Sequence, residues 1–122
     1  MRVLIIENDR DIKRMLAAAL DGDGHRATIA DFDALPERDG FGLVFTDLPD
    51  GAFSPAAARD WIGALRARYP SARVAICTAH AEARRERDRL GADALLLKPF
   101  DLRELVAVTE MLATGDGDRR GP

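Results

Sequence analysis

Four apolar runs in this 122-residue chain are each followed directly by a side chain that can carry charge or form a hydrogen bond. The four residues are Glu7, Asp47, Thr78 and Lys98. A short apolar run closed by turn residues is typical of a buried strand. In a parallel sheet the carboxyl ends of the strands meet at one edge, where open α/β folds place their ligand sites. We therefore expect these acids, the hydroxyl and the ammonium to lie together in a functional site.

Each residue also has a structural interpretation on its own. Asp47 alone is best explained as the end of a strand and the start of a turn. Glu7 and Asp9 fit helix-capping acids, Thr78 a turn hydroxyl and Lys98 a surface charge. Lys98 is, however, one of only two lysines among 18 basic residues. The joint appearance of these side chains at the ends of four strands favours the functional interpretation.

The elements that must position these side chains follow from hydrophobic periodicity. Strands are expected at 2–6, 25–30, 41–46, 72–77 and 94–97. Helices are expected at 10–20, 31–38, 55–69, 81–90 and 101–113, with Pro36 limiting the second and Ser54 capping the third. Residues 81–90 are highly polar, which fits a solvated helix or a docking face. The alternation predicts βαβ units and a three-layer α/β sandwich with a mainly parallel sheet.

Composition restricts the protein class. A hydrophobic content of 47% supports one core, so residues 1–113 are expected to form one domain and residues 114–122 a disordered tail. The net charge of −3 does not favour nucleic acid as a partner. No apolar run is long enough for a membrane span, and the N-terminus lacks a signal-peptide pattern. The single cysteine, Cys77, is expected to be a buried inert thiol in a cytoplasmic protein.

The combined motifs resemble the receiver domain of bacterial two-component response regulators. They are Val3–Ile6 with its acidic end, Asp47 after an apolar strand, Thr78–Ala79, Gly91–Asp93 and Lys98–Phe100. The resemblance covers residues 1–113. It implies a flavodoxin-like (βα)5 fold, a doubly wound sandwich whose five parallel strands lie in the order 2-1-3-4-5.

The resemblance also implies a chemistry for these positions. Asp47 would accept a phosphoryl group from a phosphohistidine on a sensor histidine kinase or a phosphotransfer protein. Lys98 would supply an ammonium that neutralises the phosphoryl charge, and Thr78 would bond a phosphoryl oxygen and move inward. Pro99 would follow Lys98 through a cis bond. The small side chain of Ala79 would leave the phosphoryl pocket open.

Mg²⁺ is the cofactor implied by the resemblance, and the chain departs from the family pattern around it. The implied ligands are Glu7, Asn8, Asp47 and the backbone carbonyl of Pro49. Asn8 replaces a carboxylate by a neutral amide, so we expect weak binding unless Asp9 or Asp50 compensates. Pro49 stands two residues after the acceptor instead of four, which makes the loop short.

The switch positions also differ from the family pattern. Leu95 occupies the position where many receivers carry an aromatic residue, so any switch must use other packing. His80 lies near the expected pocket mouth, where it either influences hydrolysis of the phosphoaspartate or is incidental.

Two function classes remain open. The first is a phospho-acceptor signalling domain, not an enzyme, read by a downstream protein at the fourth and fifth predicted helices, where weak homodimerisation is an option. The second is a phosphorylation-independent interaction module with a degenerate metal site. A haloacid-dehalogenase-type phosphatase is disfavoured, because Pro49 stands where that family needs a second aspartate. Flavin binding is disfavoured because the turn 7–10 is acidic.

Overall fold

The computed structural model describes residues 1–49 and 53–113, so Asp50 and the tail 114–122 lie outside the described residues. The described residues contain one parallel sheet of five strands in the order β2-β1-β3-β4-β5, which confirms the predicted fold. In chain order the elements are β1 (Arg2–Ile6), α1 (Arg10–Gly22), β2 (Arg26–Ala30), β3 (Leu43–Thr46), α2 (Pro55–Arg68), β4 (Arg73–Thr78), the 3₁₀ helix η1 (Ala81–Arg84), α3 (Arg87–Leu90), β5 (Ala94–Leu97) and α4 (Leu102–Ala113).

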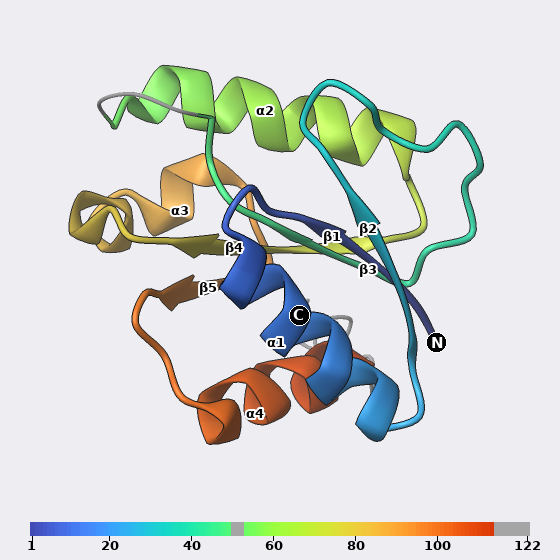
Figure 1. Ribbon diagram of the computed structural model, residues 1–122. Coiled ribbons are helices and arrows are strands. Elements are labelled where there is room, and N and C mark those ends of the chain that lie inside the picture. Colours follow the sequence, from blue (N-terminus) through green and yellow to red (C-terminus); the bar gives the residue numbers. More distant parts are fainter. Residues whose placement is uncertain (50–52, 114–122) are drawn as a thin grey trace.

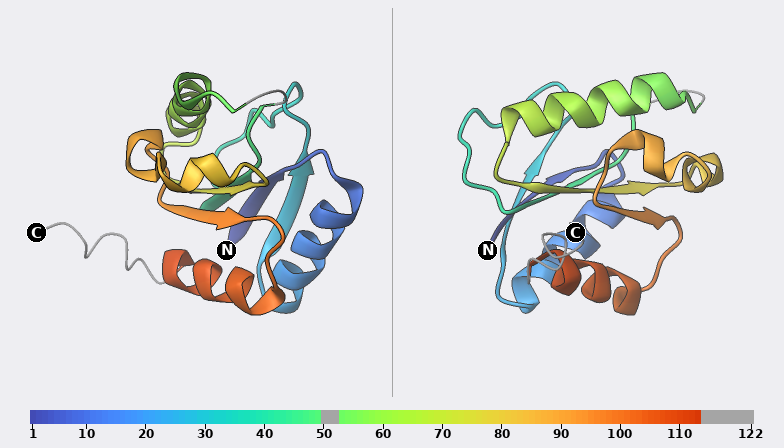
Figure 2. Two further views of the ribbon diagram at one scale, coloured as in Figure 1. Left: turned by 90° about the vertical axis from the view of Figure 1, so that its left-hand side faces the viewer. Right: turned by 180° about the vertical axis from the view of Figure 1, so that it is seen from behind.

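Helices cover both faces of the sheet (Figure 1). α1 and α4 pack on one face, and α2, η1 and α3 pack on the other, which Figure 2 shows along the layers. Side chains of a strand alternate between faces, so β1 sends Leu4 and Ile6 into one core and Val3 and Ile5 into the other. Within the described residues, no helix is long and apolar enough to cross a bilayer.

Local bonds set the starts of three helices. The carboxylate of Asp9 accepts the N–H of Ile12 at 3.0 Å and so caps α1. Ser54 caps α2, with Pro55 in its first turn. Asp101 and Glu104 form a reciprocal capping box before α4.

The helix predicted at 31–38 is absent, and β2 connects to β3 without a helix. Two residues near the end of α2 hold this segment in its irregular path. The Tyr69 hydroxyl donates to the Pro36 carbonyl at 2.6 Å, and the Arg68 guanidinium donates to the Leu35 carbonyl at 3.3 Å. Since these carbonyls bond to side chains from another element, the segment satisfies its backbone without forming helical bonds. Periodicity could not reveal bonds that come from 33 residues away.

The helix predicted at 81–90 is broken in two. η1 and the four-residue α3 are separated by Arg85 and Glu86, and only Ala83 and Leu90 of this stretch are buried. Two buried residues anchor little more than two turns, since helical stability in proteins comes mainly from packing of an apolar face. Leu102, at the start of α4, is 55% exposed.

Replacing Tyr69 by Phe tests the bond that holds the segment 31–42. The ring keeps its edge contact with Phe41 and loses the hydroxyl group, which donates to the Pro36 carbonyl and accepts from the Arg68 Nε at 3.3 Å. We expect the free energy of unfolding to fall by about 1 kcal/mol, measured by urea denaturation. Unchanged stability, with unchanged amide exchange in 31–42, would contradict this role of the hydroxyl.

Candidate functional site

The register of the sheet places the ends of β1 and β3 side by side. Ile6 pairs with Thr46, so the residues that follow, Glu7 and Asp47, stand at the same edge. The N–H of Asp47 donates to the Ile6 carbonyl at 2.9 Å and continues the ladder by one bond. The two acids are therefore neighbours because two parallel strands end at the same level.

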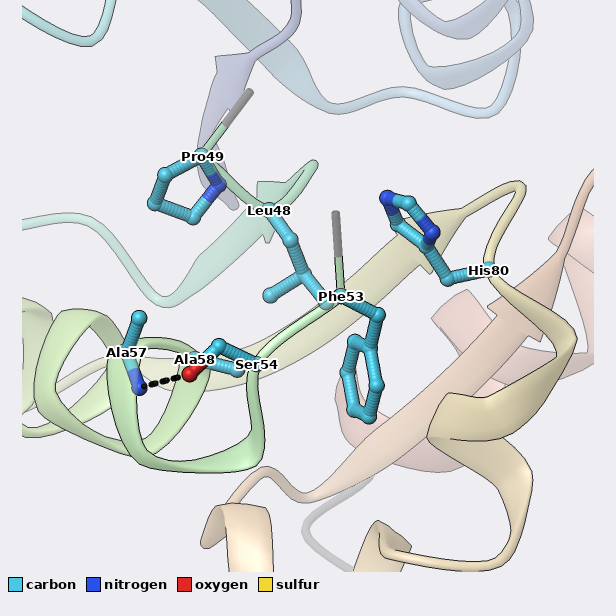
Figure 3. A pocket seen from close by; sticks show the side chains of 7 residues that line it. All are labelled: Leu48, Pro49, Phe53, Ser54, Ala57, Ala58 and His80. Atoms are coloured by element: carbon cyan, nitrogen blue, oxygen red, sulfur yellow. Dashed lines mark hydrogen bonds between the residues drawn. The ribbon is translucent and has the colours of Figure 1, made fainter. Parts of the chain in front are cut away.

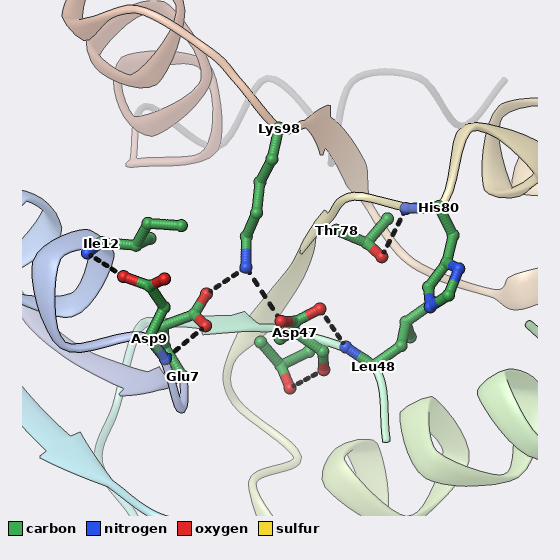
Figure 4. A network of polar contacts seen from close by, with 9 residues as sticks. Glu7, Asp9, Ile12, Asp47, Leu48, Thr78, His80 and Lys98 are labelled. Carbon is green, nitrogen blue, oxygen red and sulfur yellow. Dashed lines mark hydrogen bonds and ion pairs between the residues drawn. The ribbon is translucent and has the colours of Figure 1, made fainter. Parts of the chain in front are cut away.

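Lys98 joins the two acids from the end of β5. Leu97 pairs with Thr78, which brings the next residue to the same edge. The Lys98 Nζ lies 2.8 Å from Glu7 Oε1 and 2.9 Å from Asp47 Oδ2 (Figure 4). One ammonium is thus shared by two carboxylates, as the predicted clustering requires.

The three charged groups are unequally shielded from water. The side chain of Glu7 is 2% exposed, that of Lys98 13% and that of Asp47 23%. Burial lowers the pKa of Lys98, but its hydrogen bonds with Glu7 and Asp47 raise the pKa more, so the net shift is above the ordinary value of 10.5. The ion pair therefore stabilises the fold below pH 10.5 and is lost as the pH rises through the raised pKa.

The remaining carboxylate oxygens bond to main-chain groups. The N–H of Leu48 donates to Asp47 Oδ1 at 2.7 Å. The N–H of Asp9 donates to Glu7 Oε2 at 3.0 Å. Each acid is therefore held from two sides, by Lys98 and by a backbone amide, and its orientation is defined (Figure 4).

Thr78 is placed at the same edge but points to a different partner. It is fully buried, and its Oγ1 accepts the N–H of His80 at 3.2 Å. Among the described residues no hydrogen bond joins Thr78 to Asp47. The structure thus brings Glu7, Asp47 and Lys98 into direct contact and leaves Thr78 beside them.

Two carboxylates at this edge fit a hard cation such as Mg²⁺ in their chemistry. Glu7 Oε1 is buried and has the Lys98 ammonium as its partner, with no other hydrogen bond to a described residue. Asn8 is exposed and offers an amide oxygen without charge. In residues 1–49 and 53–113 no three His, Cys, Asp or Glu side chains are grouped to hold a metal ion. The oxygen donors are therefore of the type that Mg²⁺ prefers, but together they carry little negative charge.

Asn8 and Pro49 line an open cleft beside the acids. The other lining residues are Asp31, Phe32, Asp33 and Trp61, and the cleft measures about 590 Å³. The rings of Phe32 and Trp61 pack at 5.1 Å between centroids. The irregular segment after β2 therefore forms one wall of the space next to the candidate metal ligands.

His80 lines a second, smaller pocket next to Asp47, of about 40 Å³ (Figure 3). Its ring packs against Phe53 at 5.8 Å between centroids. Leu48, Pro49 and residues of the first turn of α2 complete the lining. The imidazole thus lies near the mouth of the site, as the sequence predicted, without a bond to the acid.

The other switch positions lie as follows. Ala79 is exposed beside Thr78, and the Lys98–Pro99 bond is cis, in agreement with the resemblance. Leu95 is half-buried and packs into the core on the α2 side of the sheet. A leucine there is already part of the packed core.

Cys77 is buried, as predicted. Burial is the main cause that raises the pKa of its thiol, with the negative charge of Glu7 adding to it. A thiol that stays protonated is a poor nucleophile, so Cys77 belongs to the core and takes no part in the site.

Two residues of the site were missed from the sequence. The Trp61 indole N–H donates to Thr46 Oγ1 at 2.9 Å, and the Thr46 hydroxyl donates to the Asp47 carbonyl at 2.6 Å. The available signal was a hydroxyl residue at the end of an otherwise apolar strand, which is fully buried here. A buried hydroxyl needs partners, but the sequence did not indicate that the chain's only tryptophan supplies one.

Comparison with known proteins gives matches in structure only. The sequence matches no protein-family model and no curated protein. The non-phosphorylated receiver domain of HemR from Leptospira biflexa has a TM-score of 0.72 at 27% identity, over 91% of this chain and 92% of that chain. A CheY-like receiver domain protein from Methanospirillum hungatei has a TM-score of 0.71 at 23% identity, over 98% of both chains.

A third similar structure was solved with a metal. The response regulator TrrA from Thermotoga maritima, in complex with Mg²⁺ and BeF, has a TM-score of 0.67 at 21% identity, over 91% of this chain and 97% of that chain. These structures confirm the fold predicted from the strand ends.

Replacing Lys98 by Met tests the shared ammonium. The variant leaves Glu7 buried without its cation, so we expect the free energy of unfolding to fall by about 3 kcal/mol at neutral pH. The difference from the unmodified protein should narrow above pH 10.5, because Lys98 itself then loses its proton. Urea denaturation at several pH values measures both effects.

The matched control is Lys13→Met, at the chain's only other lysine. That change should alter stability little at any of these pH values. Equal losses in the two variants would show that the contact with Glu7 and Asp47 contributes nothing specific.

Proposed function

We propose that this chain, which is a response-regulator receiver domain, accepts a phosphoryl group on Asp47 from a phosphohistidine of a partner protein. The observation that carries the proposal is the contact of one ammonium with both Asp47 and the buried Glu7. Asp47 is the more exposed of the two acids, so it is the one that a phosphodonor can reach. The fold supports the same assignment, since the receiver structures it resembles share the sheet order.

In the proposed reaction an Asp47 carboxylate oxygen attacks phosphorus and the bond from phosphorus to the histidine nitrogen breaks. The electron pair of that bond leaves with the imidazole of the donor. Charge on the transferring phosphoryl must be neutralised for a carboxylate to approach it. Lys98 provides one positive charge at 2.9 Å from Asp47 Oδ2. The Leu48 amide holds the other oxygen and fixes the plane of the carboxylate.

Mg²⁺ is part of the proposal as a weakly held cofactor. When bound, it would be held by Glu7, Asn8, Asp47 and the Pro49 carbonyl and would supply the further positive charge that phosphoryl transfer needs. Thr78 would donate its hydroxyl hydrogen to a phosphoryl oxygen, since its oxygen already accepts the N–H of His80. The chain's own part is to orient Asp47 and neutralise charge.

The proposed partners are a sensor histidine kinase or phosphotransfer protein and a downstream protein target. α4 exposes Leu102 and Met111, which offers apolar surface for a target or for weak homodimerisation alongside the polar α3. We propose a cytoplasmic location, no direct contact with nucleic acid or membrane, and no turnover of a free substrate. These assignments rest on the net charge of −3 and on the proposed signalling role.

A second function keeps the fold without the phosphoryl chemistry. Lys98 already forms ion pairs with both carboxylates, and the described residues lack a three-ligand metal group. A receiver fold of this kind can bind a partner by surface shape alone. Modification of Asp47 separates the two functions.

The first test is chemical phosphorylation. Incubation with phosphoramidate or acetyl phosphate and Mg²⁺ should add the mass of one phosphoryl group, because a small donor bypasses the unidentified kinase. Intact mass spectrometry measures the gain, and Asp47→Ala should abolish it. An unchanged mass in the unmodified protein would reject the phospho-acceptor function and leave the interaction module.

The second test addresses the cation. Asn8→Asp restores a negative charge at the candidate ligand, so Mg²⁺ affinity should rise by about tenfold, the effect of roughly 1.4 kcal/mol of added attraction. Trp61 fluorescence reports it, since Trp61 and Asn8 line the same cleft. Asn8→Ala serves as the control and should bind no more tightly than the unmodified protein. Tight binding by the unmodified protein would refute the expected weakness.

A further inference from the structure

A chain of hydrogen bonds runs from α2 to the peptide group beside the acceptor. The indole N–H of Trp61 donates to Thr46 Oγ1 at 2.9 Å, and Thr46 donates to the Asp47 carbonyl at 2.6 Å. An indole nitrogen only donates, so the Thr46 oxygen must accept from it. The single hydroxyl hydrogen of Thr46 is then directed to the Asp47 carbonyl.

The peptide group that receives this bond also holds the acceptor. The carbonyl of Asp47 and the N–H of Leu48 belong to one planar unit. Thr46 binds the oxygen end of that unit, and its nitrogen end donates to Asp47 Oδ1 at 2.7 Å. Any rotation of the peptide would break both bonds at once. The orientation of the acceptor carboxylate therefore depends on the peptide that Thr46 holds.

We call this chain of hydrogen bonds, from Trp61 through Thr46 to the Asp47–Leu48 peptide, the relay. Packing fixes its Trp61 end. Thr46 is fully buried at the end of β3, and Trp61 packs against Phe32 at 5.1 Å between ring centroids. Bonds in such a part-buried chain polarise one another, which strengthens each of them. Trp61, which lines the cleft, is thus linked to the Asp47 carboxylate by three successive hydrogen bonds.

We infer that Trp61 and Thr46 are positioning residues for Asp47, acting through the Asp47–Leu48 peptide on the orientation of the acceptor carboxylate. The inference rests on the proposed function for its effect on rate, and on the hydrogen bonds alone for its effect on the peptide. Lys98 holds one carboxylate oxygen and this relay holds the other. Loss of the relay leaves the charges of Glu7, Asp47 and Lys98 unchanged, but it makes the orientation of the Asp47 carboxylate less defined.

Three variants test the relay. Trp61→Phe keeps an aromatic ring and removes the N–H, Thr46→Val keeps the shape and removes the hydroxyl, and Thr46→Ser keeps the hydroxyl. We expect Trp61→Phe, which removes one hydrogen bond of the chain, to slow phosphorylation of Asp47 by phosphoramidate about fivefold. Thr46→Val removes two of these bonds and should slow phosphorylation at least as much. The double variant should be no slower than the slower single one, because both changes break one chain. Thr46→Ser should retain the normal rate.

Tyr69→Phe is the matched control. It also removes hydrogen bonds at the end of α2, but these join Tyr69 to Pro36 and Arg68 and do not lead to the acceptor. Its phosphorylation rate should stay unchanged while its stability falls. Equal rates in Tyr69→Phe, Trp61→Phe and Thr46→Val would overturn the inference, since only general stability would then be at issue.

A second measurement does not depend on phosphorylation. The exchange rate of the Leu48 amide hydrogen, taken relative to the amides of β1, reports how firmly the peptide is held. It should rise in Trp61→Phe and Thr46→Val and stay unchanged in Tyr69→Phe. If the unmodified protein gains no phosphoryl group, the proposed function fails and this exchange rate alone decides the relay. An unchanged Leu48 exchange rate in both relay variants would overturn it.

Discussion

The contact of one ammonium with two carboxylates is the constraint on which the site depends. Glu7 is almost fully buried, and a buried carboxylate without a cation would cost several kcal/mol. Lys98 removes that cost and at the same time binds Asp47, so one interaction both stabilises this edge of the sheet and holds the carboxylate of the proposed acceptor. Because Lys98 follows β5, Glu7 follows β1 and Asp47 follows β3, the contact also ties three strands together at their carboxyl ends.

α2 holds the segment between β2 and β3, which has no helix of its own. Tyr69 and Arg68, at its end, bind the carbonyls of the irregular segment, while Trp61 packs on Phe32 further along. The same helix sends the Trp61 indole to Thr46. The segment after β2 is therefore coupled to the acceptor through α2, and the cleft that the segment lines lies next to Asn8 and Pro49. This segment and the residues that follow β1 and β3 therefore meet around one cleft.

Much of this arrangement was predictable from local pattern. Apolar runs located all five strands, although β3 starts at Leu43 instead of Phe41. Capping residues located the starts of α1 and α2. The structure differs from the helices predicted at 31–38 and 81–90. These two segments have few buried side chains, so their periodicity carries little information.

The sequence by itself determined which side chains stand at the strand ends, because a strand's period and its closing turn are local properties. It also showed that an amide residue, Asn8, follows Glu7 directly. Only the tertiary structure decided which of these groups touch. The Lys98–Asp47 bond joins residues 51 apart, the Tyr69–Pro36 bond residues 33 apart and the Trp61–Thr46 bond residues 15 apart. Such contacts depend on sheet register and helix placement, which no local pattern contains.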